Sequence, residues 1–114
     1  MTLPILDPSI VASLRNLKLL ARLYPLFITT LPGHLASLQA AVLAGDRPAQ
    51  RMVAHLLRGS ASQLGALALA HAFTTIEEAI VQEDGRPWPT PAELDALIEA
   101  TITAMSDAAR TPDR

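Results

Sequence analysis

The segment from Ala54 to Gly65 holds the residues with the clearest chemical potential in this chain. Arg58 follows His55 by three positions, and Gly59 follows it by one helical turn. An ordinary imidazole has a pKa of about 6.5, so it is largely neutral at physiological pH and its free nitrogen is a usable nucleophile. An arginine at this spacing can place a fixed positive charge beside an anion that reaches the ring. The pattern is therefore compatible with a nucleophilic histidine that could react with an anionic group such as a phosphoryl group.

On a helical wheel of about 100° per residue, His55 lies opposite the core-facing side of its helix. The core-facing residues cluster at roughly 140–200° from the histidine, and they are Val53, Leu57, Ser60 and Leu64. The residues within roughly 60° of the histidine are cationic, small or polar, namely Arg51, Arg58, Gly59 and Ser62. We therefore expect His55 to be exposed on an open, cationic face.

Each of these residues also has a plain structural interpretation. A histidine on such a face can be an idle surface residue, and Arg58 can be a solvated arginine. A glycine inside an exposed helix costs about 1 kcal/mol relative to alanine, so Gly59 needs a reason to be there. It marks a kink or a close helix contact, or it leaves clearance for a partner protein that brings a phosphorylated group to His55.

Helical periodicity dominates the chain, and no alternating strand pattern is longer than a few residues. A short helix is expected over about 8–17, with Asp7 as its N-cap. A longer apolar stripe runs over about 20–42 in steps of three or four residues. Pro32 interrupts this stripe, and we expect it to kink or split the helix.

The rest of the chain continues the helical pattern and ends in a tail that we expect to fray from about Ala109. Four amphipathic helices after a short leading one predict an all-α fold, an antiparallel up-down four-helix bundle with a short extra N-terminal helix. We interpret residues 1–114 as a single domain with its core at about 5–107. The later elements are a helix that begins at an Asp46 N-cap and runs to about Gly65, a helix carrying Leu69, Phe73, Ile76 and Ile80, a loop at 83–89 and a helix over about 90–105.

The composition excludes several classes of protein. The chain has 114 residues, a net charge of −2, 4% aromatic residues and no cysteine. Disulfides and thiolate metal sites are therefore excluded, and no basic block suggests nucleic-acid binding. Two stretches lack charge, but 23–45 contains two prolines and polar residues, and 59–76 contains several polar residues, so neither is predicted to span a membrane. Since no signal peptide is visible, we expect a soluble, cytoplasmic protein.

A metal site is not expected either. His34 and His71 are separated from His55 by 21 and 16 positions, which is no metal-ligand spacing, and no nucleotide-binding glycine loop or hydrolase motif is present. We interpret both histidines as surface or helix-contact residues.

The segment Ala54–Ala66 resembles the signature of histidine phosphotransfer (HPt) domains, A-H-x-x-K-G-S/A-S/A-x-x-x-G. The resemblance covers about residues 5–105. It includes an early Leu6-Asp7-Pro8, Phe27, Gly45-Asp46 and an acidic Glu77-Glu78 pair. Domains of this family are helical bundles that shuttle phosphoryl groups between receiver-domain aspartates in multistep phosphorelays.

The resemblance implies a role for each residue of the motif. His55 would be phosphorylated, Arg58 would stabilise the phosphoryl group, and Gly59 would open the docking face. Gly65 would serve helix termination or close packing, and Ser60 would serve packing or a hydrogen bond. The supporting residues of the docking face would be Ser62, Arg51 and Gln63.

The chain departs from the family pattern at two places. The family usually has lysine where this chain has Arg58, and arginine adds a fork of donors with a different reach. Some members use a glutamine of the next helix to hydrogen-bond the histidine, and the nearest equivalent here is Glu77 or Glu78. A carboxylate there could fix the tautomer of the ring, but we interpret both glutamates as surface charges.

The resemblance also implies partners. A sensor (hybrid) histidine kinase and response-regulator receiver domains would exchange the phosphoryl group with His55, and the receiver would supply the magnesium. The chain itself would be a carrier without a cofactor or autonomous catalytic activity. Two alternatives stay open, namely a non-transferring docking module for receiver or kinase domains, and a helical enzyme subunit or dimerisation domain with an incidental histidine.

Overall fold

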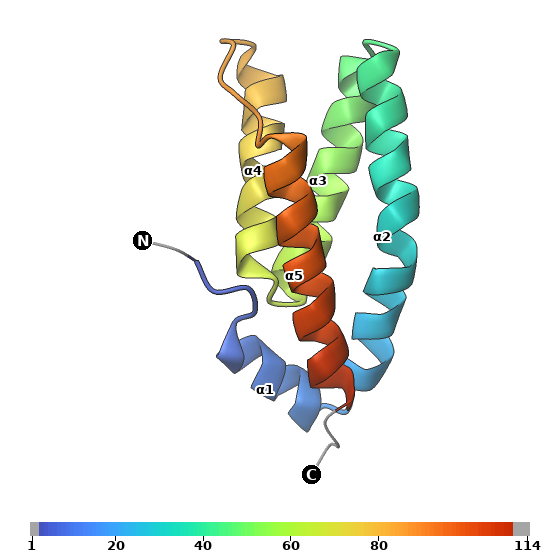
Figure 1. Cartoon of the computed structure of the whole chain (residues 1–114), viewed down its shortest axis with the longest axis vertical. Helices are drawn as coiled ribbons and strands as arrows, with labels where there is room; N and C mark the ends of the chain where they lie inside the picture. Colours follow the sequence, from blue (N-terminus) through green and yellow to red (C-terminus); the bar gives the residue numbers. More distant parts are fainter. Residues whose placement is uncertain (1–2, 111–114) are drawn as a thin grey trace.

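The computed structural model describes residues 3–110, and every regular element within them is an α-helix. Helices α2 to α5 form an antiparallel up-down bundle, and α1 packs at one end of it (Figure 1). The predicted fold class is thereby confirmed. The five helices are α1 (Pro8–Asn16), α2 (Leu20–Leu43), α3 (Arg47–Gln63), α4 (Leu67–Gln82) and α5 (Pro91–Arg110).

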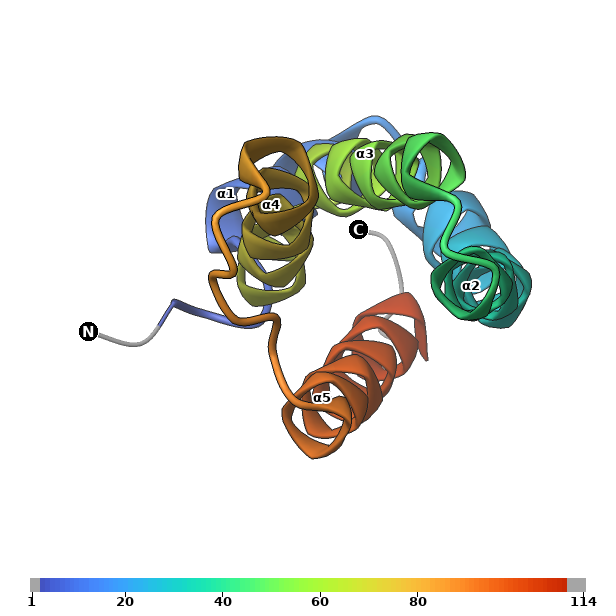
Figure 2. The same ribbon diagram turned by 90° about the horizontal axis from the view of Figure 1, so that it is seen from above.

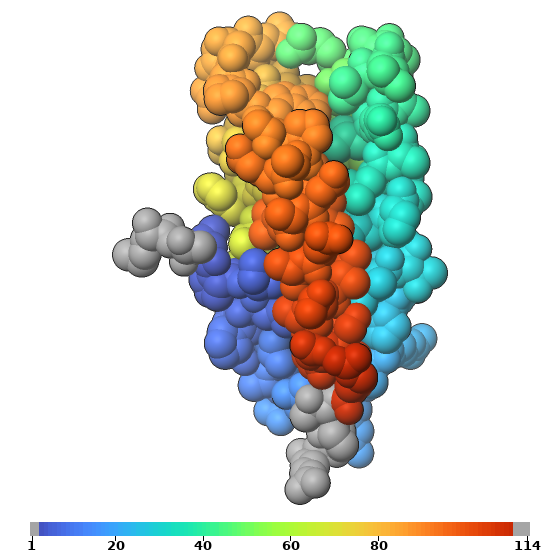
Figure 3. Space-filling view, viewed as in Figure 1, coloured from blue at the N-terminus to red at the C-terminus, as the bar shows by residue number. Residues whose placement is uncertain are grey.

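The helices of the bundle leave one side of α3 uncovered. Seen from above, α2, α3 and α4 form an arc, and α5 stands on the opposite side (Figure 2). Helices α3 and α5 each pack against both α2 and α4. Figure 3 shows α5 lying across the front of the bundle, with α1 beside its lower part. The outer side of α3 therefore faces solvent.

The core is built from one stripe of each helix. Helix α3 contributes Leu57, which is 1% exposed, together with the fully buried Ala54 and Ala61. The hydroxyl of the buried Tyr24 donates a hydrogen bond to the carbonyl of Leu64 (2.8 Å), which ties α2 to the end of α3. Burial of each large apolar side chain stabilises the fold by about 1.5–3 kcal/mol. The largest buried side chains are Tyr24, Phe73, Leu20, Leu31, Leu57, Leu69, Ile76 and Met105.

Helix α2 differs from the expectation. It is one unbroken helix over 24 residues with Pro25 and Pro32 inside it, so the expected split at Pro32 is wrong. Both prolines lie on the exposed side, where water can bind carbonyls that lack a helical donor. The opposite side carries Tyr24, Phe27 and Leu31 into the core, and this packing holds the helix together.

By length and composition alone, α2 is the one helix in the described part of the chain that could cross a membrane. A single helix of this kind is a weak indication, because a core helix of a soluble bundle has the same properties. In this bundle α2 packs its apolar stripe against α3 and α5.

The predicted helix starts are confirmed by their caps. The Asp7 carboxylate accepts a hydrogen bond from the backbone N–H of Ser9 (2.9 Å), and Asp46 accepts one from Ala49 (3.1 Å). At the other end of the chain, α5 runs to Arg110 and so includes two residues of the tail that we expected to fray. The rest of that tail, 111–114, lies outside the described residues.

Candidate functional site

His55 lies in the middle of α3, on the side that no other helix covers. Its side chain is 63% exposed, as the helical wheel predicted. Two turns of core-facing residues on the same helix, Ala54, Leu57 and Ala61, fix the rotation of α3 against the bundle. The exposure of His55 is therefore a consequence of how α3 packs.

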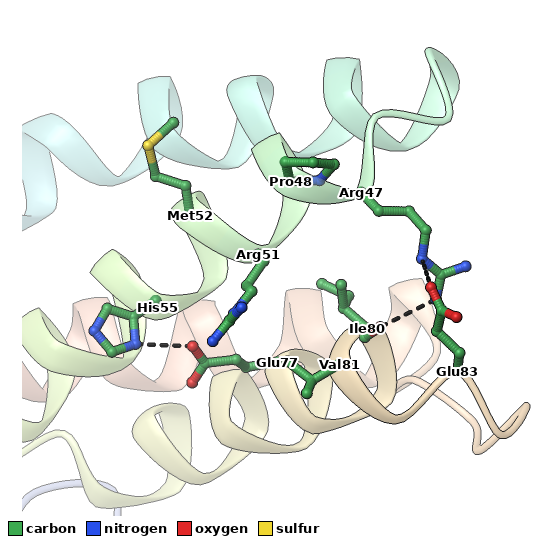
Figure 4. Close-up of a pocket in the computed structure, with 9 residues that line it drawn as sticks. All are labelled: Arg47, Pro48, Arg51, Met52, His55, Glu77, Ile80, Val81 and Glu83. Atoms are coloured by element: carbon green, nitrogen blue, oxygen red, sulfur yellow. Dashed lines mark hydrogen bonds and ion pairs between the residues drawn. The ribbon is translucent and has the colours of Figure 1, made fainter.

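Glu77 of α4 forms a hydrogen bond with the imidazole ring of His55. Its Oε2 lies 2.8 Å from Nδ1 of His55 (Figure 4), and the Glu77 side chain is only 11% exposed. An ionised carboxylate can only accept hydrogen bonds, so Nδ1 carries the ring proton and donates to Glu77. In a neutral ring Nε2 is then the unprotonated nitrogen, and it lies on the edge of the ring away from Glu77.

Arg58 completes this cluster from the next turn of α3. Its Nη1 lies 3.0 Å from Oε1 of Glu77, and its Nη2 lies 3.2 Å from Nδ1 of His55. Since the Nδ1 proton points to Glu77, the second contact places a positive charge against the ring and is not a hydrogen bond to it. Glu77 thus binds His55 with one carboxylate oxygen and Arg58 with the other.

The interpretation of both glutamates as surface charges was wrong for Glu77. This residue is buried, at 8% exposure, whereas the side chain of Glu78 is 57% exposed and pairs with Arg86 at 3.7 Å. The sequence around these two adjacent glutamates does not show which of them is buried. Glu77 turns inward because α4 places Phe73, Ile76 and Ile80 in the core, and this rotation directs position 77 toward α3.

Open hollows flank His55 between α3 and α4. The larger one, of about 560 Å³, extends from His55 and Glu77 toward the start of α3, past Arg51 and Arg47. Arg47 is anchored there, because it bonds Glu83 (2.9 Å) and the carbonyl of Ile80 (3.1 Å). The residues lining this hollow are Arg47, Pro48, Arg51, Met52, His55, Glu77, Ile80, Val81 and Glu83 (Figure 4).

Arg51 lies between the two hollows. It lines the larger one and also a smaller one of about 290 Å³ that includes Arg58. Within the described part of the chain it forms no ion pair, so its charge faces solvent. Met52 beside it is 67% exposed and Val81 across the groove is 46% exposed. The face around His55 therefore combines positive charge with accessible apolar side chains.

The glycines of the motif have different structural roles. A Cβ atom added to Gly59 would meet no atom within 4 Å, so this position is open space one turn beyond His55. Gly65 ends α3 with a φ of +78°, and a Cβ atom there would lie 2.9 Å from the Ile10 side chain. Gly65 thus serves both helix termination and close packing. Ser60 is half-buried and lines a hollow on the α2 side.

Two of the expected supporting residues lie apart from His55. Gln63 lines a separate hollow with Leu23 and Phe27, so the structure does not bring it to the groove beside the histidine. Ser62 is exposed and lines neither of the hollows that flank His55. The wheel placed Ser62 on the exposed side of α3 but could not show that the larger hollow beside His55 extends the other way, toward the start of α3.

The other histidines do not join the site. His34 is half-buried on α2, and His71 is exposed on α4. Within residues 3–110, no group of three or more histidine, aspartate or glutamate residues is arranged to hold a metal ion.

Comparisons with known proteins agree with this geometry. The profile of the Hpt domain family matches residues 22–109, whereas a comparison with curated proteins gave no significant match. The structure is similar to the crystal structure of histidine-containing phosphotransfer protein B (HptB) from Pseudomonas aeruginosa PAO1. The TM-score is 0.68 at 29% identity, over 95% of this chain and 90% of that one. Because the profile matches most of the chain, the protein belongs to the Hpt domain family of histidine phosphotransfer proteins.

Proposed function

We propose that His55 accepts a phosphoryl group from the aspartyl phosphate of a receiver domain, or from a histidine kinase, and passes it to the receiver aspartate of a response regulator. Proteins of the Hpt family work with such partners in phosphorelays. The observation that carries the proposal is the exposed His55, whose Nδ1 is bound by the buried Glu77 so that Nε2 is the free nucleophile.

The transfer step follows from this arrangement. The Nε2 lone pair attacks phosphorus, the bond between phosphorus and the aspartyl oxygen breaks, and the aspartate leaves as a carboxylate. The Nδ1 proton stays on the ring, which gains positive charge as the bond to phosphorus forms. The Glu77 carboxylate, 2.8 Å away, stabilises that charge. Donation to the next receiver is the same step in reverse.

The neighbours of His55 would support this step. Arg58 would stabilise the phosphoryl group, and the open position at Gly59 would let a receiver approach the ring. The charge of Arg51 and the apolar Met52 and Val81 suit a protein partner. The receiver would supply magnesium, and the chain would act in the cytoplasm as a carrier without catalytic activity of its own.

A transfer assay tests the proposal. The chain is incubated with a phosphorylated receiver domain and magnesium, and label on the protein is tested for stability in acid and alkali. We expect acid-labile, alkali-stable label on the wild type and on the His71→Gln control, whose histidine is also exposed. His55→Gln should take none.

Two outcomes would contradict the proposal in different ways. Label on His55→Gln would show that another residue carries the phosphoryl group. Binding of receivers by a wild type that takes no label from any of them would identify the chain as a docking module.

A further inference from the structure

The ion pair with Glu77 holds Arg58 beside the His55 ring before any phosphoryl group is present. Nη1 of Arg58 pairs with Oε1 of Glu77 at 3.0 Å, and Nη2 lies 3.2 Å from the His55 ring. A free arginine side chain on a helix surface samples many rotamers, and ordering it costs free energy. Here the buried end of the pair is rigid, because Glu77 is 8% exposed and belongs to the packed side of α4.

The two oxygens of Glu77 have different partners. Oε2 takes the Nδ1 proton of His55, and Oε1 takes Arg58. A guanidinium has five donors in a planar fork, so Nη1 can stay on Glu77 while Nη2 donates to a further acceptor. The acceptor that arrives during transfer is a phosphoryl oxygen on Nε2, and Nη2 turns from its place beside Nδ1 to reach it.

We infer that Glu77 is a positioning residue that acts through Arg58: by holding Nη1, it keeps the guanidinium beside the His55 ring, within reach of the phosphoryl group that forms on Nε2. This inference rests on the proposed function. It also gives a physical reason for the combination of Glu77 with Arg58, since a carboxylate can accept hydrogen bonds from the imidazole ring and from the arginine at the same time. A glutamine at position 77 has one acceptor oxygen in place of two and no negative charge, so it would hold Arg58 less firmly.

The inference is tested with a small phosphoryl donor, so that docking of a receiver does not enter the result. With phosphoramidate, the bond between Nε2 and phosphorus forms, the nitrogen–phosphorus bond of the donor breaks, and ammonia leaves. We expect Glu77→Gln to slow the labelling of His55 about three- to tenfold, which corresponds to the cost of ordering one long side chain. In an Arg58→Ala background the same substitution should have a clearly smaller effect.

Glu78→Gln is the matched control, because it removes the same charge from the next residue, whose side chain is exposed. It should leave the labelling rate unchanged. A second measurement follows the side-chain Nε–Hε signal of Arg58 by NMR in the wild type, which needs no variant. We expect an ordered signal that stays ordered and shifts when His55 is phosphorylated.

The contradicting results are distinct. If Glu77→Gln speeds labelling, Glu77 competes with the phosphoryl group for Arg58 and the inference is wrong. If the substitution has an equal effect with and without Arg58, or if the wild-type Arg58 signal is disordered, Glu77 does not act through Arg58. In these cases the proposed function stands, whereas failure of phosphoramidate to label His55 at all would overturn both.

Discussion

Replacement of Gly59 by alanine should make this protein more stable. Gly59 lies inside α3 and is exposed, and an added Cβ atom would meet no atom within 4 Å. Alanine is favoured over glycine in a helix interior by about 1 kcal/mol. In a domain of this size, this difference raises Tm by roughly 4–8 °C. The wild-type glycine therefore lowers stability, and no close contact in the described part of the chain requires it.

We expect the gain in stability to be accompanied by a loss of transfer. A side chain at position 59 projects next to His55, where a receiver must come close to bring its aspartyl phosphate to Nε2. Gly59→Ala should reduce the rate of transfer from a phosphorylated receiver, and Gly59→Leu should reduce it by about tenfold or more, as expected for overpacking of an interface. Labelling by phosphoramidate should be unchanged, because a small donor does not need the clearance.

Gly33→Ala provides the matched control for both measurements. Gly33 is also inside a helix, is exposed and has no atom within 4 Å of an added Cβ atom, but it lies on α2. It should raise Tm by a similar amount and leave transfer unchanged. Normal receiver transfer by Gly59→Leu would refute the clearance argument, and a fall in Tm for Gly59→Ala would refute the energetic one.

Three further predictions concern the scaffold. Leu57→Ala should lower the free energy of unfolding by about 2–5 kcal/mol in urea titrations, because Leu57 is 1% exposed; a loss below about 1 kcal/mol would mean that the core relaxes around it. Gly65→Ala should also destabilise the fold in the same assay, since the new methyl group would lie 2.9 Å from Ile10 at a φ of +78°. Hydrogen bonds from Arg86 lower the pKa of Asp84 from 3.8 to about 2, so the stability that this pair contributes is present above pH 3.8 and lost as the pH falls through about 2. An NMR titration of the Asp84 carboxyl should show this midpoint, and Arg86→Ala should return it toward 3.8.

The sequence was sufficient to predict which residues of α3 are exposed, but not which residues of α4 lie beside them. Periodicity fixes which residues of one helix share a side, so the burial of Leu57 and the exposure of His55 followed directly. The burial of Glu77 depends on how α4 is rotated against α3, and a pair of adjacent glutamates shows no such rotation. The same limit explains why Gln63 was grouped with the histidine although it lines a different hollow.

The helix does not split at Pro32, and the sequence could not show this for a related reason. Local rules describe the loss of one backbone hydrogen bond, which favours a break in the helix. Whether the helix continues depends on the packing gained on both sides of the proline. Here Phe27 and Leu31 are buried before it and Leu38 after it, and these tertiary contacts outweigh the local preference.

The central claim is that Nε2 of His55 carries the phosphoryl group while Nδ1 keeps its proton on Glu77. It is tested most directly by NMR of the phosphorylated protein, prepared with ¹⁵N-labelled histidine. We predict coupling between phosphorus and Nε2 of His55, together with a protonated Nδ1. Coupling of phosphorus to Nδ1, or to a nitrogen of another histidine, would contradict the account.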